Sequence, residues 1–271
     1  MNKEEIIKKI KKIEIASSLL ANEIFSGNYR SFFKGNGMEF SDIRRYSSGD
    51  DVKKIDWKVS ARQRKTYVKE FTEEREINIY LLIDISSSNN FPAKQDLIAQ
   101  LVGSLSFSAI KNNDKVGAIF FSDTIEKIIP LKKGKKQGLI ILDNFLSLSP
   151  KGRGTNIFDA LHFFNKIAKQ RSIVFLISDF IDNSSYDSAM KLVKLKHDLI
   201  PIKISDKKFE NLPKDIIFTL SDSETDKEIV IENYNKFSLE ESEISNNILN
   251  IYTDENYIVK LVNFFKKRRK L

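Results

Sequence analysis

One apolar segment constrains the fold of this chain more than any other. Residues 77–83 read Ile-Asn-Ile-Tyr-Leu-Leu-Ile, a run with a single polar residue. A strand this apolar is typical of a parallel sheet that is covered by helices on both faces. The run stops at Asp84, and Ser86 and Ser88 follow at alternate positions. We therefore expect a buried strand that brings one carboxylate and two hydroxyls to its carboxyl end.

The remaining segments alternate between strand and helix, which predicts an α/β fold with a doubly wound, mostly parallel sheet. A strand pair at 216–220 and 228–231 is expected at an edge, and a helix at 3–25 precedes the sheet. Helices are predicted at residues 93–112, 135–148, 155–170, 186–195 and 256–269, and strands at 116–121, 124–130, 172–179, 198–204 and 250–253.

Two further segments should place oxygen atoms at the same edge of the sheet. The strand 172–179 ends on Asp179, and the loop Lys-Gly-Arg-Gly-Thr-Asn at 151–156 brings Thr155 to a helix start. Taken alone, Thr155 is equally well explained as a helix N-cap and Asp179 as a loop-capping residue. Ligand sites of open α/β sheets lie at the carboxyl ends of the strands, however, and hard divalent cations prefer oxygen ligands of these kinds.

Composition excludes several classes of site. The chain has no cysteine, so disulfides, thiolate catalysis and Cys-based zinc sites are excluded. His162 and His197 are the only histidines, which argues against a His-rich metal site. At 41% hydrophobic and 30% charged residues, the 271-residue chain has the composition of a globular protein with an adequate core.

The net charge of +8 lies partly in two basic ends, residues 8–12 and 266–270. Such runs can contact nucleic acid or an anionic membrane, but a solvated helix end is the simpler interpretation. We expect no specific nucleic acid and at most weak peripheral membrane contact. No stretch approaches the ~20 apolar residues of a transmembrane span, and the N-terminus lacks the apolar core of a signal peptide. We expect a cytoplasmic protein.

Residues 27–65 are predicted to be a long irregular region, rich in Gly, Asp and Arg, before a strand at 66–71. Such regions are usually functional or packed on the core. We favour a structural role over a direct partner-binding surface, with Trp57 and Tyr46 buried and Gly37 and Gly49 at positive φ. The side chains expected to form an ion-pair network there are Asp42, Arg44, Arg45, Asp50, Asp51, Asp56 and Arg62.

The order Asp-x-Ser-x-Ser, Gly-Thr-Asn and a strand-terminal Asp resembles the metal-ion-dependent adhesion site of von Willebrand factor A domains. In that family two Ser and one Thr bind Mg²⁺ directly, the two Asp often act through water, and an open position accepts a partner's carboxylate. The resemblance implies a site for Mg²⁺ or Mn²⁺. One departure is Phe180, where many of these domains carry Gly. The implied ligands are Asp84, Ser86, Ser88, Thr155 and Asp179.

The upstream block resembles a narrower family, the bacterial domain-of-unknown-function family fifty-eight. These are von Willebrand factor A-like proteins usually found beside MoxR-type AAA+ ATPases. The resemblance implies a von Willebrand factor A-like domain at 76–271, with residues 1–75 forming an N-terminal helix and a loop embellishment packed on it. The motifs that carry it include Asp42-Ile43-Arg44-Arg45-Tyr46, Gly49-Asp50-Asp51, Ile55-Asp56-Trp57 and Ser60-Ala61-Arg62.

These resemblances imply a non-enzymatic module that binds a partner through a metal-bridged carboxylate and cooperates with a MoxR-type ATPase on an unknown client protein. Two alternatives remain open. Asp84 and Asp179 around Mg²⁺ could support phosphoester or phosphoryl-transfer chemistry, although the chain has no Walker-type Gly-x-x-x-x-Gly-Lys-Ser/Thr motif and no histidine in the ligand segments. The basic ends could bind nucleic acid or an anionic membrane, with an affinity that falls steeply with salt.

Overall fold

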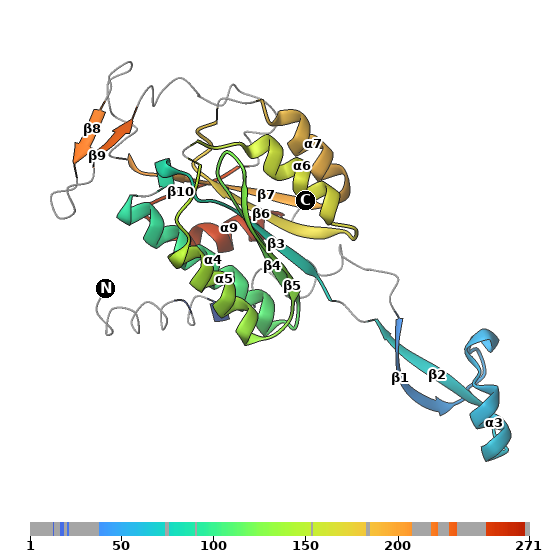
Figure 1. Ribbon diagram of the computed structural model, residues 1–271. Coiled ribbons are helices and arrows are strands. Elements are labelled where there is room, and N and C mark those ends of the chain that lie inside the picture. The colour runs from blue at the N-terminus through green and yellow to red at the C-terminus, as the bar shows by residue number, and fades with distance from the viewer. Residues whose placement is uncertain are drawn as a thin grey trace. The chain divides into compact units, whose positions relative to one another are not determined.

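Six strands form one sheet in the larger of the two units of the computed structural model, residues 1–29 with 77–271 (Figure 1). The strand order is β10-β7-β6-β3-β4-β5, and every neighbouring pair is parallel except β4 with β5. This confirms the predicted doubly wound, mostly parallel sheet. The strands are β3 Asn78–Asp84, β4 Lys115–Phe121, β5 Ile125–Lys132, β6 Ser172–Ser178, β7 Asp198–Ser205 and β10 Leu249–Tyr252.

The structure describes residues 13, 17–18, 21, 38–73, 76–89, 91–152, 154–182, 185–207, 218–221, 228–231 and 248–268. Four residues of the predicted N-terminal helix fall within these ranges and are helical, whereas the rest of it, and Gly37, lie outside them. In the part of the chain that the structure describes, no helix combines the length and the apolar character needed to cross a bilayer.

Helices cover both faces of the sheet, close to their predicted bounds. The helices α4 Pro92–Lys111 and α5 Lys135–Ser147 lie on one face, and α6 Ile157–Ile167 and α7 Asp187–Lys196 lie on the other (Figure 1). The closing helix, α9 Tyr257–Arg268, packs on the α4 face, where the hydroxyls of Tyr257 and Ser104 lie 2.9 Å apart.

The central strand β3 is buried on both faces, as its composition predicts. Its side chains alternate between the two helix layers, because successive residues of a strand point to opposite faces. Tyr80 and Leu82 belong to the core cluster under α6 and α7, where the ring of Tyr80 meets that of Phe164 edge to face at 5.1 Å. Two ordered layers of helix therefore fix the position of the strand end that carries Asp84.

A short segment near the N-terminus packs on α4 through Ile13, which clusters with Ala99 and Leu142. The approach is close: a Cβ added to Gly103 would lie 2.9 Å from the Cγ2 of Ile13. Glycine at this position in a helix costs some helix propensity, and it is explained here by the packing of Ile13.

Strands β8 Phe218–Ser221 and β9 Glu228–Ile231 pair antiparallel, as predicted for this stretch. The expectation that they lie at an edge of the main sheet was wrong, because they form a two-stranded sheet of their own.

The smaller unit, residues 30–76, contains more regular structure than the predicted long loop. Strand β1 Met38–Arg45 pairs antiparallel with β2 Tyr67–Glu73, and the register shifts between Phe40 and Asp42. That shift breaks the alternation by which a strand is recognised. A 3-10 turn, η1 Val52–Lys54, and a helix, α3 Trp57–Gln63, lie between the two strands.

The expectation that Trp57 and Tyr46 are buried was wrong. Trp57 is 68% exposed in the first turn of α3, and Tyr46 is 36% exposed. Among the described side chains of this unit, only Val68 is buried. These described side chains form no core that could enclose an indole ring.

The acidic residues of the smaller unit serve mainly as local hydrogen-bond acceptors. Arg44 forms two bonds to Asp50, at 2.7 and 2.8 Å, and one to Glu70 at 2.7 Å. The guanidinium lowers the pKa of Asp50 to about 2. Asp51 and Asp56 cap η1 and α3 instead, and Asp56 also lies 3.5 Å from Lys69. Within the described residues, neither Asp42 nor Arg62 has an ion-pair partner. Gly49 has a φ of +105°.

The histidine that follows α7 predicts a pH dependence of stability. His197 is buried, its ring lies 4.8 Å from that of Phe164, and neither ring nitrogen has a partner among the described residues. Burial, followed by the charges of Lys196 and Arg171, lowers its pKa below 6.5. The folded state therefore binds fewer protons than the unfolded state below that pH, and stability falls as the pH falls.

We expect His197→Phe to reduce the slope of the unfolding free energy between about pH 7 and pH 5, measured by urea unfolding. His162→Phe is the matched control, because His162 is exposed and stacked on Phe158. A wild-type slope in His197→Phe would contradict the assignment.

Candidate metal centre

The carboxylate of Asp84 is the point at which three distant segments meet. Asp84 is the last residue of β3 and has no solvent exposure. Its Oδ1 accepts a bond from the backbone nitrogen of Ser86 at 2.9 Å. Its Oδ2 accepts one from the hydroxyl of Ser178 at 2.5 Å and one from the hydroxyl of Thr155 at 3.4 Å. The strand end that carries Asp84 and the loop that carries Thr155 therefore meet, as the sequence predicts.

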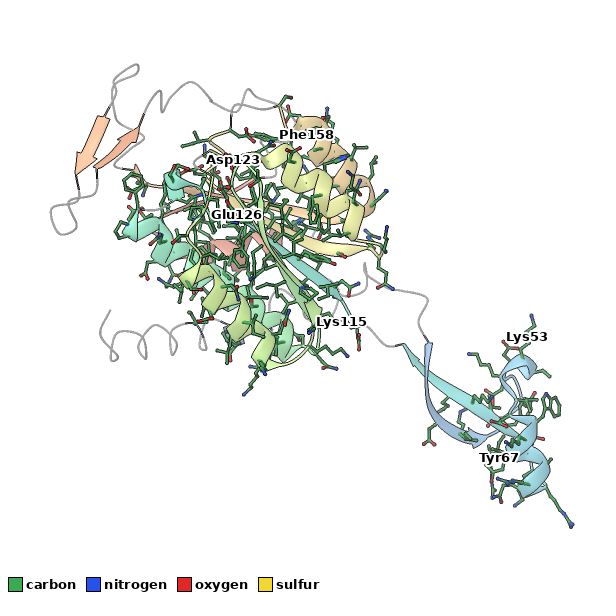
Figure 2. The ribbon with its side chains drawn as sticks, viewed as in Figure 1. Lys53, Tyr67, Lys115, Asp123, Glu126 and Phe158 are labelled. Atoms are coloured by element: carbon green, nitrogen blue, oxygen red, sulfur yellow. The ribbon has the colours of Figure 1, made fainter. Side chains whose placement is uncertain are left out.

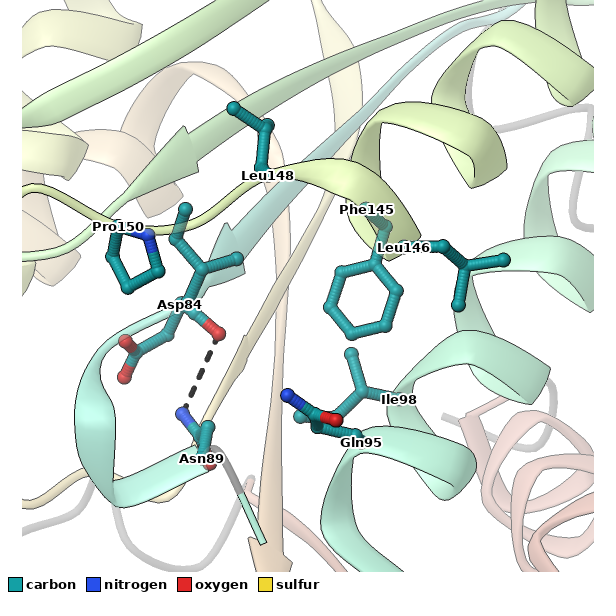
Figure 3. Close-up of a pocket in the computed structure, with 9 residues that line it drawn as sticks. Asp84, Asn89, Gln95, Ile98, Phe145, Leu146, Leu148 and Pro150 are labelled. Atoms are coloured by element: carbon teal, nitrogen blue, oxygen red, sulfur yellow. Dashed lines mark hydrogen bonds between the residues drawn. The ribbon is translucent and has the colours of Figure 1, made fainter. Parts of the chain in front are cut away.

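The two serine hydroxyls lie together because the chain turns sharply after β3. The 3-10 turn η2 Ser87–Asn89 follows Asp84, and the backbone nitrogen of Asn89 donates to the carbonyl of Ser86 at 3.0 Å. The side-chain amide of Asn89 also reaches back to the carbonyl of Asp84 at 3.4 Å (Figure 3). The hydroxyl oxygens of Ser86 and Ser88 are 3.1 Å apart as a result.

The loop that carries Thr155 is attached to the neighbouring hairpin by one carboxylate. This carboxylate belongs to Glu126 near the start of β5, which is labelled in Figure 2. Glu126 accepts bonds from the backbone nitrogens of Lys151 and Gly152, at 2.9 and 3.1 Å, and from the hydroxyl of Ser122 at 2.7 Å. The loop approaches the β4–β5 hairpin so closely at Gly152 that a side chain would clash, since a Cβ at this position would lie 2.6 Å from the Oγ of Ser122.

Thr155 does not serve as the cap of α6. The N-cap is Asn156, whose side-chain oxygen accepts a bond from the backbone nitrogen of Asp159 at 2.9 Å. The backbone nitrogen of Asn156 in turn donates to the carbonyl of Ser122 at 2.8 Å. The hydroxyl of Thr155 is left to face Asp84.

Asp179, which follows β6 directly, meets a lysine. Its Oδ1 accepts a bond from the backbone nitrogen of Ile181 at 3.1 Å, and its Oδ2 accepts one from the Nζ of Lys94 at 3.0 Å. Lys94 comes from the first turn of α4 and also donates to the carbonyl of Ser88 at 3.1 Å. Both side chains of the pair are almost completely enclosed.

The two carboxylates are close enough to influence each other. Burial, followed by the charge of Asp179, raises the pKa of Asp84 above its ordinary value, against hydrogen bonds from Ser178 and Ser86 that lower it. A positive charge next to a buried carboxylate with a raised pKa stabilises its ionised form.

Phe180 adopts the backbone conformation that glycine favours. Its φ is +59°, and its backbone nitrogen donates to the hydroxyl of Ser178 at 3.0 Å. The ring is buried near Tyr186, with the ring centroids 6.0 Å apart. Burial of the ring offsets the backbone strain, so this departure from the von Willebrand pattern keeps a left-handed turn after Asp179.

The residues present fit a hard divalent cation. Their donor atoms are hydroxyl and carboxylate oxygens, which suit Mg²⁺ and Mn²⁺. In the described part of the chain, no three His, Cys, Asp or Glu side chains come together as a metal cluster. A cation here would therefore depend on the hydroxyls of Ser86, Ser88 and Thr155. The ligand roles of these residues stay a prediction.

Sequence reasoning missed three residues of this site: Lys94, Glu126 and Ser178. Lys94 had a detectable signal, because it lies four residues before Ile98, on the same buried helical stripe as Leu101 and Leu105. A lysine in a core-facing position indicates a buried cation. Ser178 precedes the strand-terminal Asp179, but Glu126 has no local signal, since its partners come from a distant loop.

A small pocket of about 70 Å³ adjoins the main chain of Asp84. The carboxylate of Asp84 points away from the side chains of Ile98, Phe145 and Leu146 (Figure 3). Among the described residues, the Oδ1 of Asn89 has no hydrogen-bond partner. The pocket is far smaller than the ~300–1,000 Å³ of typical small-molecule sites. It is lined by Asp84, Ile85, Asn89, Gln95, Ile98, Phe145, Leu146, Leu148 and Pro150.

Removal of the Glu126 carboxylate should loosen the loop that carries Thr155. In Glu126→Ala, the backbone nitrogens of Lys151 and Gly152 lose their acceptor. We expect amide hydrogen exchange in this loop to become faster, by mass spectrometry of the matching peptide. Lys127→Ala, an exposed position on the same strand, should leave exchange unchanged. Equal exchange in the two variants would show that Glu126 does not hold the loop.

The chain is similar to several solved structures, among them the following two. It is similar to the conserved hypothetical protein BatB from Bacteroides thetaiotaomicron, at 16% identity and a TM-score of 0.49, covering 72% of this chain and 100% of that one. It is also similar to proximal thread matrix protein 1 from the mussel byssus, in a structure with a zinc-occupied MIDAS motif. That similarity has 20% identity and a TM-score of 0.42, covering 71% and 46% of the two chains.

Sequence relatives come from two bacterial groups. "Uncharacterized protein Rv1480" of Mycobacterium tuberculosis is 20% identical over 282 residues, 96% of this chain and 89% of that protein. "Uncharacterized protein YeaD" of Bacillus subtilis is 35% identical over 95 residues, 35% of this chain and 22% of YeaD. The family model described as "Protein of unknown function DUF58" matches residues 42–241, from Asp42 through the strand ends that carry Asp84 and Asp179. This match confirms the resemblance of the upstream block, and the chain belongs to the DUF58 family.

Proposed function

We propose that this protein is a non-enzymatic binding module that captures a carboxylate of a partner protein through a divalent metal, Mg²⁺ or Mn²⁺. The residues that would hold the ion are Asp84, Ser86, Ser88, Thr155 and Asp179. The observation that supports the proposal is the meeting of hydroxyls on one buried carboxylate from positions 71 and 94 residues further along the chain. These bonds compensate the burial of the carboxylate, and the same hydroxyl and carboxylate oxygens are the ligands that a hard divalent cation prefers.

The donor set favours an acidic partner. Three of the five side chains are neutral hydroxyls, so they add no negative charge at the site. A bound divalent ion would supply a strong positive charge and an open position for an anionic oxygen. Ser86, Ser88 and Thr155 are preorganised for this, because the η2 turn and the Glu126 bonds hold their backbones in position.

The site offers little support for the enzymatic alternative. His197 precedes β7, so it lies at the amino edge of the parallel sheet, opposite the edge that carries Asp84. His162 is exposed on α6 and stacks on Phe158. Neither can serve as a general base for a reaction at Asp84, and the adjoining pocket of about 70 Å³ is too small for a nucleotide.

We extend the proposal to partners on the basis of family membership. The expected partner is a MoxR-type AAA+ ATPase, with which the module would assemble or remodel a client protein. The basic C-terminal end gives less support to a nucleic-acid or membrane role, because Arg268 is paired with Asp198 at 2.7 Å.

Metal binding should depend on Asp84. We expect the wild-type protein to bind Mn²⁺ at a single saturable site, and Asp84→Asn to weaken this binding by at least ~10-fold, because it removes a buried negative charge next to the ion. Electron paramagnetic resonance of free Mn²⁺ during a titration measures the affinity. Asp143→Asn removes an exposed charge on α5 and should bind as the wild type does. Equal affinity in all three proteins would refute the site.

Partner capture should require the metal as well. A MoxR-type ATPase encoded beside this gene should co-purify with the wild-type protein in Mg²⁺, but not in EDTA or with Asp84→Asn. The measurement is a quantitative pull-down with purified proteins. Capture that survives both EDTA and the substitution would contradict a metal-bridged carboxylate as the mode of contact.

A further inference from the structure

The lysine at the metal centre is buried to an unusual degree. Lys94 is 1% exposed, and among the described residues no other lysine is buried. Lysines are almost never fully buried unless they are paired. Among the described residues, its Nζ donates to the carboxylate of Asp179 at 3.0 Å and to the carbonyl of Ser88 at 3.1 Å. This ammonium group is therefore part of the site.

The helix that carries Lys94 gives no local reason for a cation at this position. Lys94 lies in the first turn of α4, where the helix dipole disfavours positive charge. It also occupies the apolar stripe that continues with Ile98 and Leu101. Enclosing an ammonium group in such a place costs more than a methionine would. The position makes sense only through what the charge does to Asp179 and its surroundings.

The charges of the centre can be counted directly. With both carboxylates ionised, as metal ligands are, Asp84 and Asp179 supply two negative charges and Lys94 supplies one positive charge, so the buried groups together carry −1. A divalent ion would change this to +1, and a partner carboxylate would bring it to zero. Without Lys94, the two aspartates alone would neutralise the ion, and nothing would remain to attract a further anion.

We propose that Lys94 is a resident counter-ion that competes with the metal for Asp179 and makes retention of the metal depend on a bound carboxylate. The inference rests on the proposed function and adds the residue that sets its selectivity. Lys94 acts through Asp179, so it is a positioning residue. In the protein without its acidic partner the lysine holds Asp179, and an arriving carboxylate restores the charge balance that keeps the ion in place.

A purely structural ion pair makes the opposite prediction for metal affinity. If Lys94 only held Asp179 in position, its removal would disorder a ligand and weaken metal binding. If Lys94 competes with the metal, its removal strengthens metal binding. The direction of the change in affinity therefore separates the two roles, whatever happens to stability.

The test is a Mn²⁺ titration of the full chain, followed by electron paramagnetic resonance. We expect Lys94→Met to bind Mn²⁺ at least ~10-fold more tightly than the wild type, because one positive charge next to the ion is gone. Lys94→Arg should stay near the wild-type affinity. Lys136→Met is the control for net charge, since Lys136 is exposed on α5, roughly 13 Å along the helix from Phe145 of the Asp84 pocket.

Added acetate provides a second measurement that needs no variant. In the wild type, Mn²⁺ affinity should rise with acetate at constant ionic strength, because the two ligands must strengthen each other equally. In Lys94→Met this dependence should be at least ~5-fold smaller. If Lys94→Met does not fold, an absence of acetate dependence in the wild type is sufficient to overturn the proposal.

The outcomes distinguish this inference from the function on which it rests. Mn²⁺ binding that is lost in Asp84→Asn but unchanged or weakened in Lys94→Met would overturn the role of Lys94 and leave the metal site intact. An absence of Mn²⁺ binding in both the wild type and Lys94→Met would overturn both.

Discussion

Asp84 is a carboxylate without access to solvent, placed at the end of a strand that is buried on both faces of the sheet. Such a group is costly to bury unless hydrogen bonds and charges compensate it. The structure meets this requirement with hydrogen bonds from one backbone nitrogen and from two hydroxyls of other segments. An ammonium group pairs with the neighbouring carboxylate of Asp179. Much of the arrangement at this edge of the sheet can be understood as the environment that this one side chain needs.

The fold supplies the rigidity for that environment. β3 lies between β6 and β4, and helices cover both faces of the sheet around it. The parallel neighbour β6 brings Ser178 and Asp179 to the same edge, while the β4–β5 hairpin brings Glu126 to the loop of Thr155. Elements that are distant in the chain thus fix the hydroxyls to within hydrogen-bond distances, the precision that a cation site requires.

The net charge of the site determines which kind of ligand it favours. A site with two aspartates and no lysine would be satisfied by a divalent ion alone. The pair of Lys94 with Asp179 changes that balance, and it does so with a residue that no packing requirement explains. A metal held in this way would favour an acidic ligand over water, as the proposed function requires.

The sequence by itself determined the class of the fold and the polar residues that end two of its buried strands, because both rest on local signals. An unbroken apolar run identifies a strand buried on both faces, and parallel strands must end at a common edge. The sequence failed where local signals mislead. The register shift at Phe40 and Asp42 hid a strand, and the aromatic character of Trp57 suggested burial for a side chain that is exposed.

Only the tertiary structure decided that Asn156 rather than Thr155 caps α6, that Glu126 holds the loop, and that Lys94 neutralises Asp179. These contacts join residues far apart in the chain, and their existence depends on how helices and strands are placed in space. A residue's own neighbours in sequence report its burial and its backbone, but the charge that it meets across a core is set by packing alone.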